Sequence, residues 1–359
     1  MEQPTNGSNG ARRDARRLRN GLVWTAVLAA LLLGIGLAVP DLREVLDRAS
    51  KANLGWLGLA VALELASCLG YVGTVRLVLS RGPARMVRRL AWAEMAFGAV
   101  VPVGGAGGLA VGAWAMRTWG IAWSRIANRS AVIFLLTSAV NGAVLGLAGV
   151  GLLAGVGHTR ADFIYGLIPA VVAFAGFAFF LALPRLLGEP EPSREQSRAR
   201  AALSREASWV RDTEEVAFTP NWRLLGTVGY LVFDIAVLWA CLRALGVNAP
   251  IVAVVLGYQI GYLANLVPIP GGLGVLEGGL LGALLLYGLP AAPTAAAVVL
   301  YHAIALWVPT LGGTVGFARL RTALAMQRPQ LATEESRQQP PARAERVPAP
   351  SSRASDLAA

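Results

Sequence analysis

Six stretches of about 20 consecutive apolar residues constrain this chain more than any other feature: Gly21–Val39, Leu54–Leu79, Ser130–Gly155, Asp162–Leu183, Leu224–Leu245 and Thr294–Phe317. A helix of that length can cross a hydrocarbon core of about 30 Å. Lipid offers no hydrogen-bond partners, so a spanning segment must satisfy its own backbone groups, as a helix does. The pattern therefore predicts an all-α polytopic membrane protein with about six crossing helices.

The charges support this class and indicate how the chain is oriented. Only 15% of the residues are charged, against about a quarter in an average soluble domain. The net charge of +11 comes mostly from arginines beside the apolar stretches, seven of them in residues 184–223. Cytoplasmic retention of basic loops and contact with anionic lipid explain this placement. We expect membrane lipids, anionic ones above all, as partners, and no nucleic acid.

Two further apolar regions, Ala91–Met116 and Ile251–Tyr287, are broken by proline and glycine. The first contains V-P-V-G-G-A-G-G (Val101–Gly108), and the second contains V-P-I-P-G-G-L-G-V-L-E-G (Val267–Gly278). Broken helices are costly in lipid unless they are buried or line a polar cavity. A matched pair of them in two halves of a chain indicates a transporter-like binding site.

Arginine placement predicts how the two broken regions lie. Arginines flank the first region on both sides, so it should enter and leave on the cytoplasmic side as a re-entrant hairpin. The second region has Arg243 before it and no charge in residues 288–293 after it, so it should enter from outside. The same rule predicts cytoplasmic N- and C-termini for a multi-pass protein of the inner (plasma) membrane.

Two hairpins that enter from opposite faces predict an inverted repeat of residues 54–155 and 224–317. Glu64 and Asp234 each lie ten residues into their spans, and Gly120 corresponds to Gly288. The expected organisation is a disordered basic tail (1–20), a transmembrane domain (21–326) and a second disordered tail (327–359). The cytoplasmic loop 184–223 is expected to be a solvated connector, although a surface helix around Leu203, Ala207 and Val210 is the alternative.

The glycines of the broken motifs are candidate substrate-binding residues. Backbone N–H groups at the start of a half-helix bind anions, and missing side chains let a phosphate approach. The two expected cradles are Gly104, Gly105, Gly107 and Gly108 in the first motif, and Gly271, Gly272 and Gly274 in the second. Close packing of the hairpins, which also needs small residues, is the alternative.

Polar residues within the apolar regions complete the candidate site. Glu277 follows the second glycine cluster, and it would bind a cationic headgroup or proton, or else cap the broken helix. Glu64 and Asp234 are candidates for headgroup contact or proton coupling. Asn265 lies one turn before Pro268 and would bind freed backbone carbonyls or substrate. Arg76 would bind a phosphate unless it extends to the interface instead.

The sequence contains few residues suited to metal or covalent chemistry. It has two histidines and two cysteines, and both Cys68 and Cys241 fall within apolar spans. No nucleophile elbow, zinc-binding helix or phosphate loop is recognisable. We therefore expect no metal, no cofactor and no enzymatic activity.

The second motif, together with R-L-V-L at Arg76–Leu79 and V-P-V-G-G at Val101–Gly105, resembles the lysylphosphatidylglycerol synthase transmembrane (flippase-like, YbhN-like) family. The resemblance covers about residues 54–320. It implies a membrane domain that moves lipids or lipid-linked molecules between leaflets. Bifunctional members add a soluble aminoacyl-transferase domain, which we expect to be absent here. His302 stands where relatives often have arginine.

These observations predict a protein that translocates a phospholipid or lipid-linked anion between leaflets. The alternative is a non-transporting membrane scaffold for an envelope-lipid enzyme. An intramembrane enzyme is a third possibility, disfavoured by the missing catalytic residues.

Overall fold

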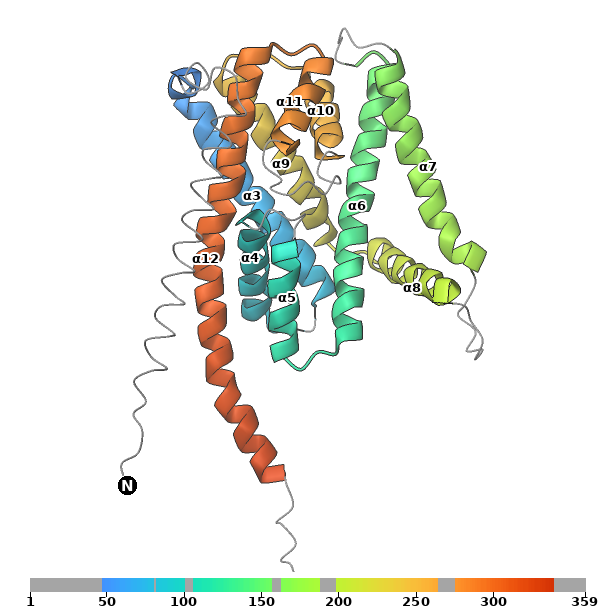
Figure 1. The fold of residues 1–359 in the computed structure, drawn as a ribbon, viewed down its shortest axis with the longest axis vertical. Helices are drawn as coiled ribbons and strands as arrows, with labels where there is room; N and C mark the ends of the chain where they lie inside the picture. Colours follow the sequence, from blue (N-terminus) through green and yellow to red (C-terminus); the bar gives the residue numbers. More distant parts are fainter. Residues whose placement is uncertain are drawn as a thin grey trace, which may run out of the picture.

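The structure is a computed structural model that describes residues 47–80, 82–100, 106–156, 163–187, 198–263 and 275–338, and these residues contain helices and no strands (Figure 1). The helices are α3 (Leu54–Val78), α4 (Ala84–Val100), α5 (Ala106–Thr118), α6 (Trp123–Leu153), α7 (Phe163–Leu187), α8 (Arg198–Phe218), α9 (Leu224–Ala244), α10 (Ile251–Leu263), α11 (Val275–Leu286) and α12 (Ala291–Gln338).

Five of these helices, α3, α6, α7, α9 and α12, are long and apolar enough to cross a membrane. They coincide with five of the predicted spans, which confirms the all-α polytopic class. The sixth predicted span, Gly21–Val39, lies outside the described residues.

The short helices form two pairs in opposite halves of the molecule. Figure 1 shows α4 and α5 in the lower half and α10 and α11 in the upper half. Each of the four has 12 to 17 residues, or about 18 to 26 Å at 1.5 Å per residue, less than a hydrocarbon core. Gly120 and Gly288 follow α5 and α11 with φ of 77° and 83°. Both pairs thus end in the left-handed turn that glycine favours. This arrangement is consistent with two re-entrant hairpins and with an inverted repeat, and both stay predictions.

Helices α3 and α9 form the central contact of the molecule and run antiparallel. Ser67 Oγ donates to the Tyr230 carbonyl (2.9 Å), and the Thr74 and Thr227 hydroxyls lie 3.1 Å apart. A Cβ added at Gly70 would lie 2.6 Å from Tyr230 N and 2.7 Å from the Gly226 carbonyl. Glycine therefore lets the two backbones touch.

Glycines also set the contacts of the peripheral helices. A Cβ on Gly312 would lie 2.3 Å from the ring of Trp92, and this is where α12 crosses α4. A Cβ on Gly142 or Gly146 would lie 3.2 Å from Phe177 or Ala173 of α7. Small residues spaced four apart thus lie at helix contacts in both places.

Two segments differ from the prediction. Most of the connector expected to be solvated is helix α8, which packs on α6 and α7 with Val210 2% exposed. Asn128 Nδ2 of α6 donates to Asp212 Oδ2 at 2.9 Å. Helix α12 continues to Gln338, into the segment expected to be disordered. Arginine and glutamate, which recur in both segments, favour helix, as do the alanines of α8 and the glutamines at the end of α12.

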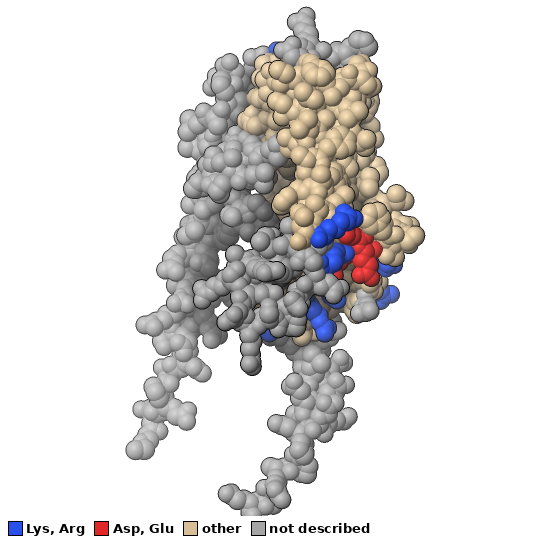
Figure 2. All heavy atoms as spheres, turned by 90° about the vertical axis from the view of Figure 1, so that its right-hand side faces the viewer, with Lys and Arg blue, Asp and Glu red and all other residues tan. Residues whose placement is uncertain are grey.

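The outer surface has an apolar band and one strongly charged end. On α7, large apolar side chains such as Phe163, Ile168 and Phe179 are more than half exposed, as expected of a surface covered by acyl chains. Figure 2 shows charged side chains gathered toward the lower part of one face. We call the end of the molecule where α3, α5 and α7 end and α4, α6 and α9 begin the arginine-rich end. The arginines in these helix ends, together with Arg319 beside α4, are Arg76, Arg85, Arg88, Arg89, Arg117, Arg125, Arg185, Arg223 and Arg319.

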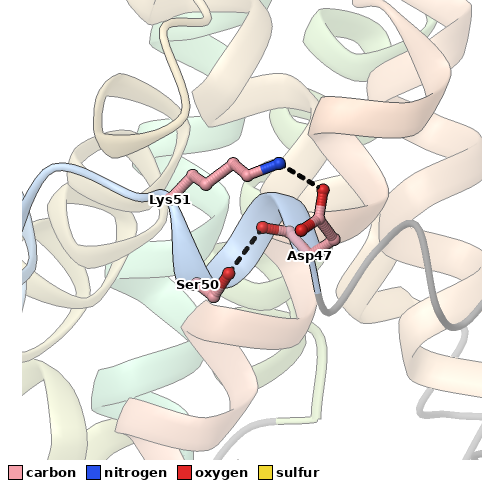
Figure 3. Close-up of polar contacts among 3 residues, drawn as sticks. All are labelled: Asp47, Ser50 and Lys51. Carbon is pink, nitrogen blue, oxygen red and sulfur yellow. Dashed lines mark hydrogen bonds and ion pairs between the residues drawn. The ribbon is translucent and has the colours of Figure 1, made fainter.

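The opposite end carries fewer charges. There Lys51 Nζ pairs with the Asp47 carboxylate at 2.5 Å, and Ser50 Oγ donates to the Asp47 carbonyl (Figure 3). Asn53 N donates to the Ala244 carbonyl, which ties the start of α3 to the end of α9 at this end. The charge difference between the ends is the one that the positive-inside rule predicts for a cytoplasmic arginine-rich end.

Candidate carboxylate–tyrosine site

The register of α3 against α9 brings Glu64 and Asp234 together. Ser67 lies against Tyr230, so one turn back along α3 and one turn forward along α9 leads to Glu64 and Asp234. Both residues therefore lie on the faces that α3 and α9 turn toward each other. They lie near the middle of their helices, at the eleventh residue of each. One acidic residue from each of the two predicted repeats thus lies near the middle of its helix, on the side that faces the other helix.

Tyrosines from two other helices surround Asp234. Tyr258 of α10 donates to Asp234 Oδ2, and Tyr301 of α12 lies 3.1 and 3.2 Å from its two carboxylate oxygens. Tyr262 and Tyr301 share a hydrogen bond of 3.0 Å, and the rings of Tyr258 and Tyr262 stack at 4.5 Å. Helices α10 and α12 therefore converge on one carboxylate of α9 through aromatic hydroxyls.

Glu64 is less well satisfied than Asp234. Its side chain is only 5% exposed, and Oε1 accepts a weak hydrogen bond from Cys68 Sγ at 3.7 Å. Oε2 is buried and has no hydrogen-bond partner among the described residues. Within that same part of the chain, neither Glu64 nor Asp234 forms an ion pair with a basic side chain. An acidic pair without a countercharge at membrane depth is suited to bind a proton or a cationic group.

A third buried carboxylate, that of Glu94, lies apart from Glu64 and Asp234. Glu94 of α4 is 9% exposed, and Tyr71 of α3 donates to its Oε2 at 3.1 Å. A Cβ on Gly112 would lie 2.2 Å from Glu94 Oε1, so α5 covers this carboxylate closely. The Glu94 side chain is therefore buried between helices.

The structure places the predicted site residues in several locations. Glu64 and Asp234 meet, whereas Arg76 lies in the last turn of α3, twelve residues or about 18 Å along the helix from Glu64. Glu277 belongs to the first turn of α11, as predicted, and its side chain lies outside the description. The residues outside the described ranges are Gly104, Gly105, Asn265, Gly271, Gly272 and Gly274.

The remaining two glycines favour the packing alternative. Gly107 and Gly108 are both buried in α5. A Cβ on Gly108 would lie 2.6 Å from the Glu94 carbonyl, so this glycine allows α5 to touch α4. The same holds in the other pair, where a Cβ on Gly261 would lie 2.6 Å from Leu280 Cα.

Sequence reasoning missed the tyrosines and the buried position of Glu94. Tyr258, Tyr262 and Tyr301 lie in apolar runs, where a tyrosine is usually a packing or interface residue. One signal was present: Tyr258 and Tyr262 are four residues apart, so they share a helix face.

The fold and the site define a polytopic α-helical membrane protein with buried acidic groups between its helices. Residues 22–313 match the family described as the lysylphosphatidylglycerol synthase transmembrane region, and the chain belongs to this family. It is also 36% identical over 90 residues to a UPF0104 membrane protein of Methanothermobacter thermautotrophicus. That match covers 25% of this chain and 26% of the relative.

Proposed function

We propose that this protein translocates a phospholipid or a lipid-linked anion between the leaflets of the membrane, acting as a transporter and not as an enzyme. The observation that carries the proposal is the pair Glu64 and Asp234, which has no basic partner within the described residues. Ionisable groups at membrane depth are costly and typically mark transport pathways. The pair would bind a proton or the cationic part of a headgroup during transport.

The two short helix pairs support the proposal. They lie in opposite halves of the molecule, one with Glu94 and one with Tyr258 and Tyr262. In transporters built from inverted repeats, such pairs give a central site alternate access from the two sides. Membership of the lysylphosphatidylglycerol synthase transmembrane-region family, whose name concerns a phospholipid, fits a lipid cargo.

The direct test uses the full chain reconstituted in liposomes with fluorescent anionic phospholipid in both leaflets. A membrane-impermeant quencher then reports how fast inner-leaflet lipid reaches the outside. We expect the wild-type chain to redistribute lipid faster than empty vesicles do. With Asp234→Asn or Glu64→Gln the rate should be at least about tenfold lower than that of the wild type, which corresponds to about 1.4 kcal/mol in the activation barrier. Glu215→Gln, an exposed acidic residue of α8, is the matched control and should leave the rate unchanged.

Two results would reject the proposal. Wild-type rates no higher than those of empty vesicles would favour the alternative of a non-transporting scaffold. Translocation rates that neither substitution changes would show that the carboxylate pair takes no part in translocation. Unfolding temperatures of all variants in detergent distinguish loss of transport from loss of fold.

A further inference from the structure

A basic cleft opens between α4 and α12 at the arginine-rich end. Its volume is about 350 Å³, and we call it the arginine cleft. Figure 1 shows the two helices side by side there, and their contact is among the most extensive in the molecule. The cleft is lined by Arg85, Arg88, Arg89, Trp92, Val315 and Arg319, with Gly312 and Gly316 on the α12 side.

The sequence builds this cleft from two helix faces. Arg85, Arg88, Arg89 and Trp92 recur every three or four residues, so they share one face of α4. The glycines of α12 let it approach that face: a Cβ on Gly316 would lie 2.8 Å from Trp92 Cβ. Arg89 Nη1 donates to the Arg319 carbonyl at 3.4 Å across the two helices. The cleft is therefore part of the helix crossing.

No acidic side chain of the described residues compensates the positive charge of the cleft. Arg85, Arg88, Arg89 and Arg319 make no ion pair with any acidic side chain in the described part of the chain. Arg85 and Arg88 lie in the first turns of α4, where the helix dipole adds further positive potential. Four cations around one hollow attract an anion, and guanidinium groups suit phosphate oxygens in particular.

The lining is ordered along the axes of α4 and α12. Along α4, the arginines at 85 and 88 lie outward and Trp92 lies deeper. Along α12 the order is the same, with Arg319 outward and Val315 deeper and half exposed. A phospholipid has this polarity, with an anionic phosphate above an apolar glycerol and acyl region. Free inorganic phosphate would use the arginines but gain nothing from Trp92 and Val315.

We propose that the arginine cleft binds the phosphate headgroup of an anionic phospholipid from the leaflet at the arginine-rich end. The arginines hold the phosphate, while Trp92 and Val315 contact the first apolar carbons. This goes beyond the proposed translocation, because binding at the cleft does not require that the chain moves lipid across the membrane.

The test measures lipid binding to the full chain in detergent by titration with short-chain phosphatidylglycerol and with phosphatidylcholine of the same acyl length. The cleft variant carries Arg85→Gln, Arg88→Gln and Arg319→Gln; Arg89 is kept because it bonds to α12. The matched control carries Arg117→Gln, Arg125→Gln and Arg185→Gln, three exposed arginines outside the cleft at the same end.

We expect the cleft variant to bind phosphatidylglycerol at least about tenfold more weakly, and the control to stay within about twofold of wild type. Phosphatidylcholine should bind more weakly than phosphatidylglycerol to the wild type. The single variant Arg88→Gln, at an exposed position, should weaken binding about fivefold and serves if the triple variant does not fold.

Three results would overturn the proposal. The cleft variants bind phosphatidylglycerol as tightly as wild type; the control loses as much affinity as the cleft variant; or inorganic phosphate competes at the lipid's own concentration. The last result would assign the cleft to a free anion. Because binding is measured without vesicles, failure here leaves the flux experiment unaffected, and failure there leaves this one unaffected.

Discussion

At the scale of single residues, tyrosine hydroxyls donate to two of the buried acidic groups of the described residues, Asp234 and Glu94, whereas Glu64 accepts from Cys68. Asp234 accepts from Tyr258 and Tyr301, and Glu94 accepts from Tyr71. A hydroxyl donates a hydrogen bond without adding a positive charge, so the carboxylate keeps its ability to attract a proton or a cation. A basic partner would have neutralised it. This choice of partner differs from a structural ion pair and is consistent with the proposed transport role.

Tyr71→Phe tests how much one such hydrogen bond contributes. The substitution removes the donor to buried Glu94 and should lower the free energy of unfolding by about 1–3 kcal/mol. Tyr230→Phe is the matched control, because the Tyr230 ring packs on Tyr71 at 5.3 Å and its hydroxyl makes no hydrogen bond to a described residue. We expect the control to change stability by less than about 0.5 kcal/mol. Denaturant unfolding of the full chain in detergent compares them, and equal losses would contradict the assignment.

At the scale of helices, glycines determine how closely the elements approach. Gly70 and Gly226 bring α3 onto α9, Gly108 brings α5 onto α4, and Gly261 brings α10 onto α11. Helices in lipid associate through packing and not through the hydrophobic effect, so close backbone contact is a main source of stability.

Gly70→Ala should therefore be destabilising. The new methyl group would meet the α9 backbone at 2.6 Å, and such overpacking costs about 1–3 kcal/mol. Gly58→Ala on the same helix has nothing within 4 Å and should be neutral or slightly stabilising, since alanine favours helix. The unfolding temperatures of both variants in detergent are the measurement. A Gly70→Ala protein as stable as the Gly58→Ala protein would exclude the close crossing.

The sequence predicted the elements better than the site. Runs such as Leu224–Leu245 identify their helices because lipid demands length and apolarity at every position. Glu64 and Asp234 were recognised because charge is rare in such runs. Tyr301 was not, because a tyrosine in an apolar run carries no mark of its hydrogen-bond partner. The arginine cleft was also missed: Arg85, Arg88 and Arg89 were interpreted as a flanking charge, since the opposing Arg319 is brought near only by the fold.

At the scale of the whole molecule, the arrangement has two unlike ends. The arginine-rich end contains the turn between α5 and α6 and the start of α9 at Leu224. The other end contains Lys51, Arg243 and the start of α12. Such a charge difference orients a polytopic protein with its basic end in the cytoplasm.

Cysteine accessibility tests this orientation and the re-entrant course together. A cysteine at Thr118, the last residue of α5, should react with an impermeant reagent only from the arginine-rich side, and one at Ala291, at the start of α12, only from the opposite side. Native Cys68 and Cys241 are buried and should give little background. Reaction of both positions from the same side would falsify the two-hairpin topology.

The contact between Gly70 and Gly226 has one more consequence. Because backbone touches backbone there, with no side chain that can rotate aside, α3 and α9 cannot slide or separate without losing van der Waals contact and the Ser67 and Thr74 hydrogen bonds. The acidic pair is thus carried by two helices whose relative position is held by close backbone contact. In the proposed transport, a gate that exposes the pair first to one leaflet and then to the other would be formed by the helices around α3 and α9. Helices α10 and α12 already contact Asp234 through the Tyr258 and Tyr301 hydroxyls, and these hydrogen bonds can break.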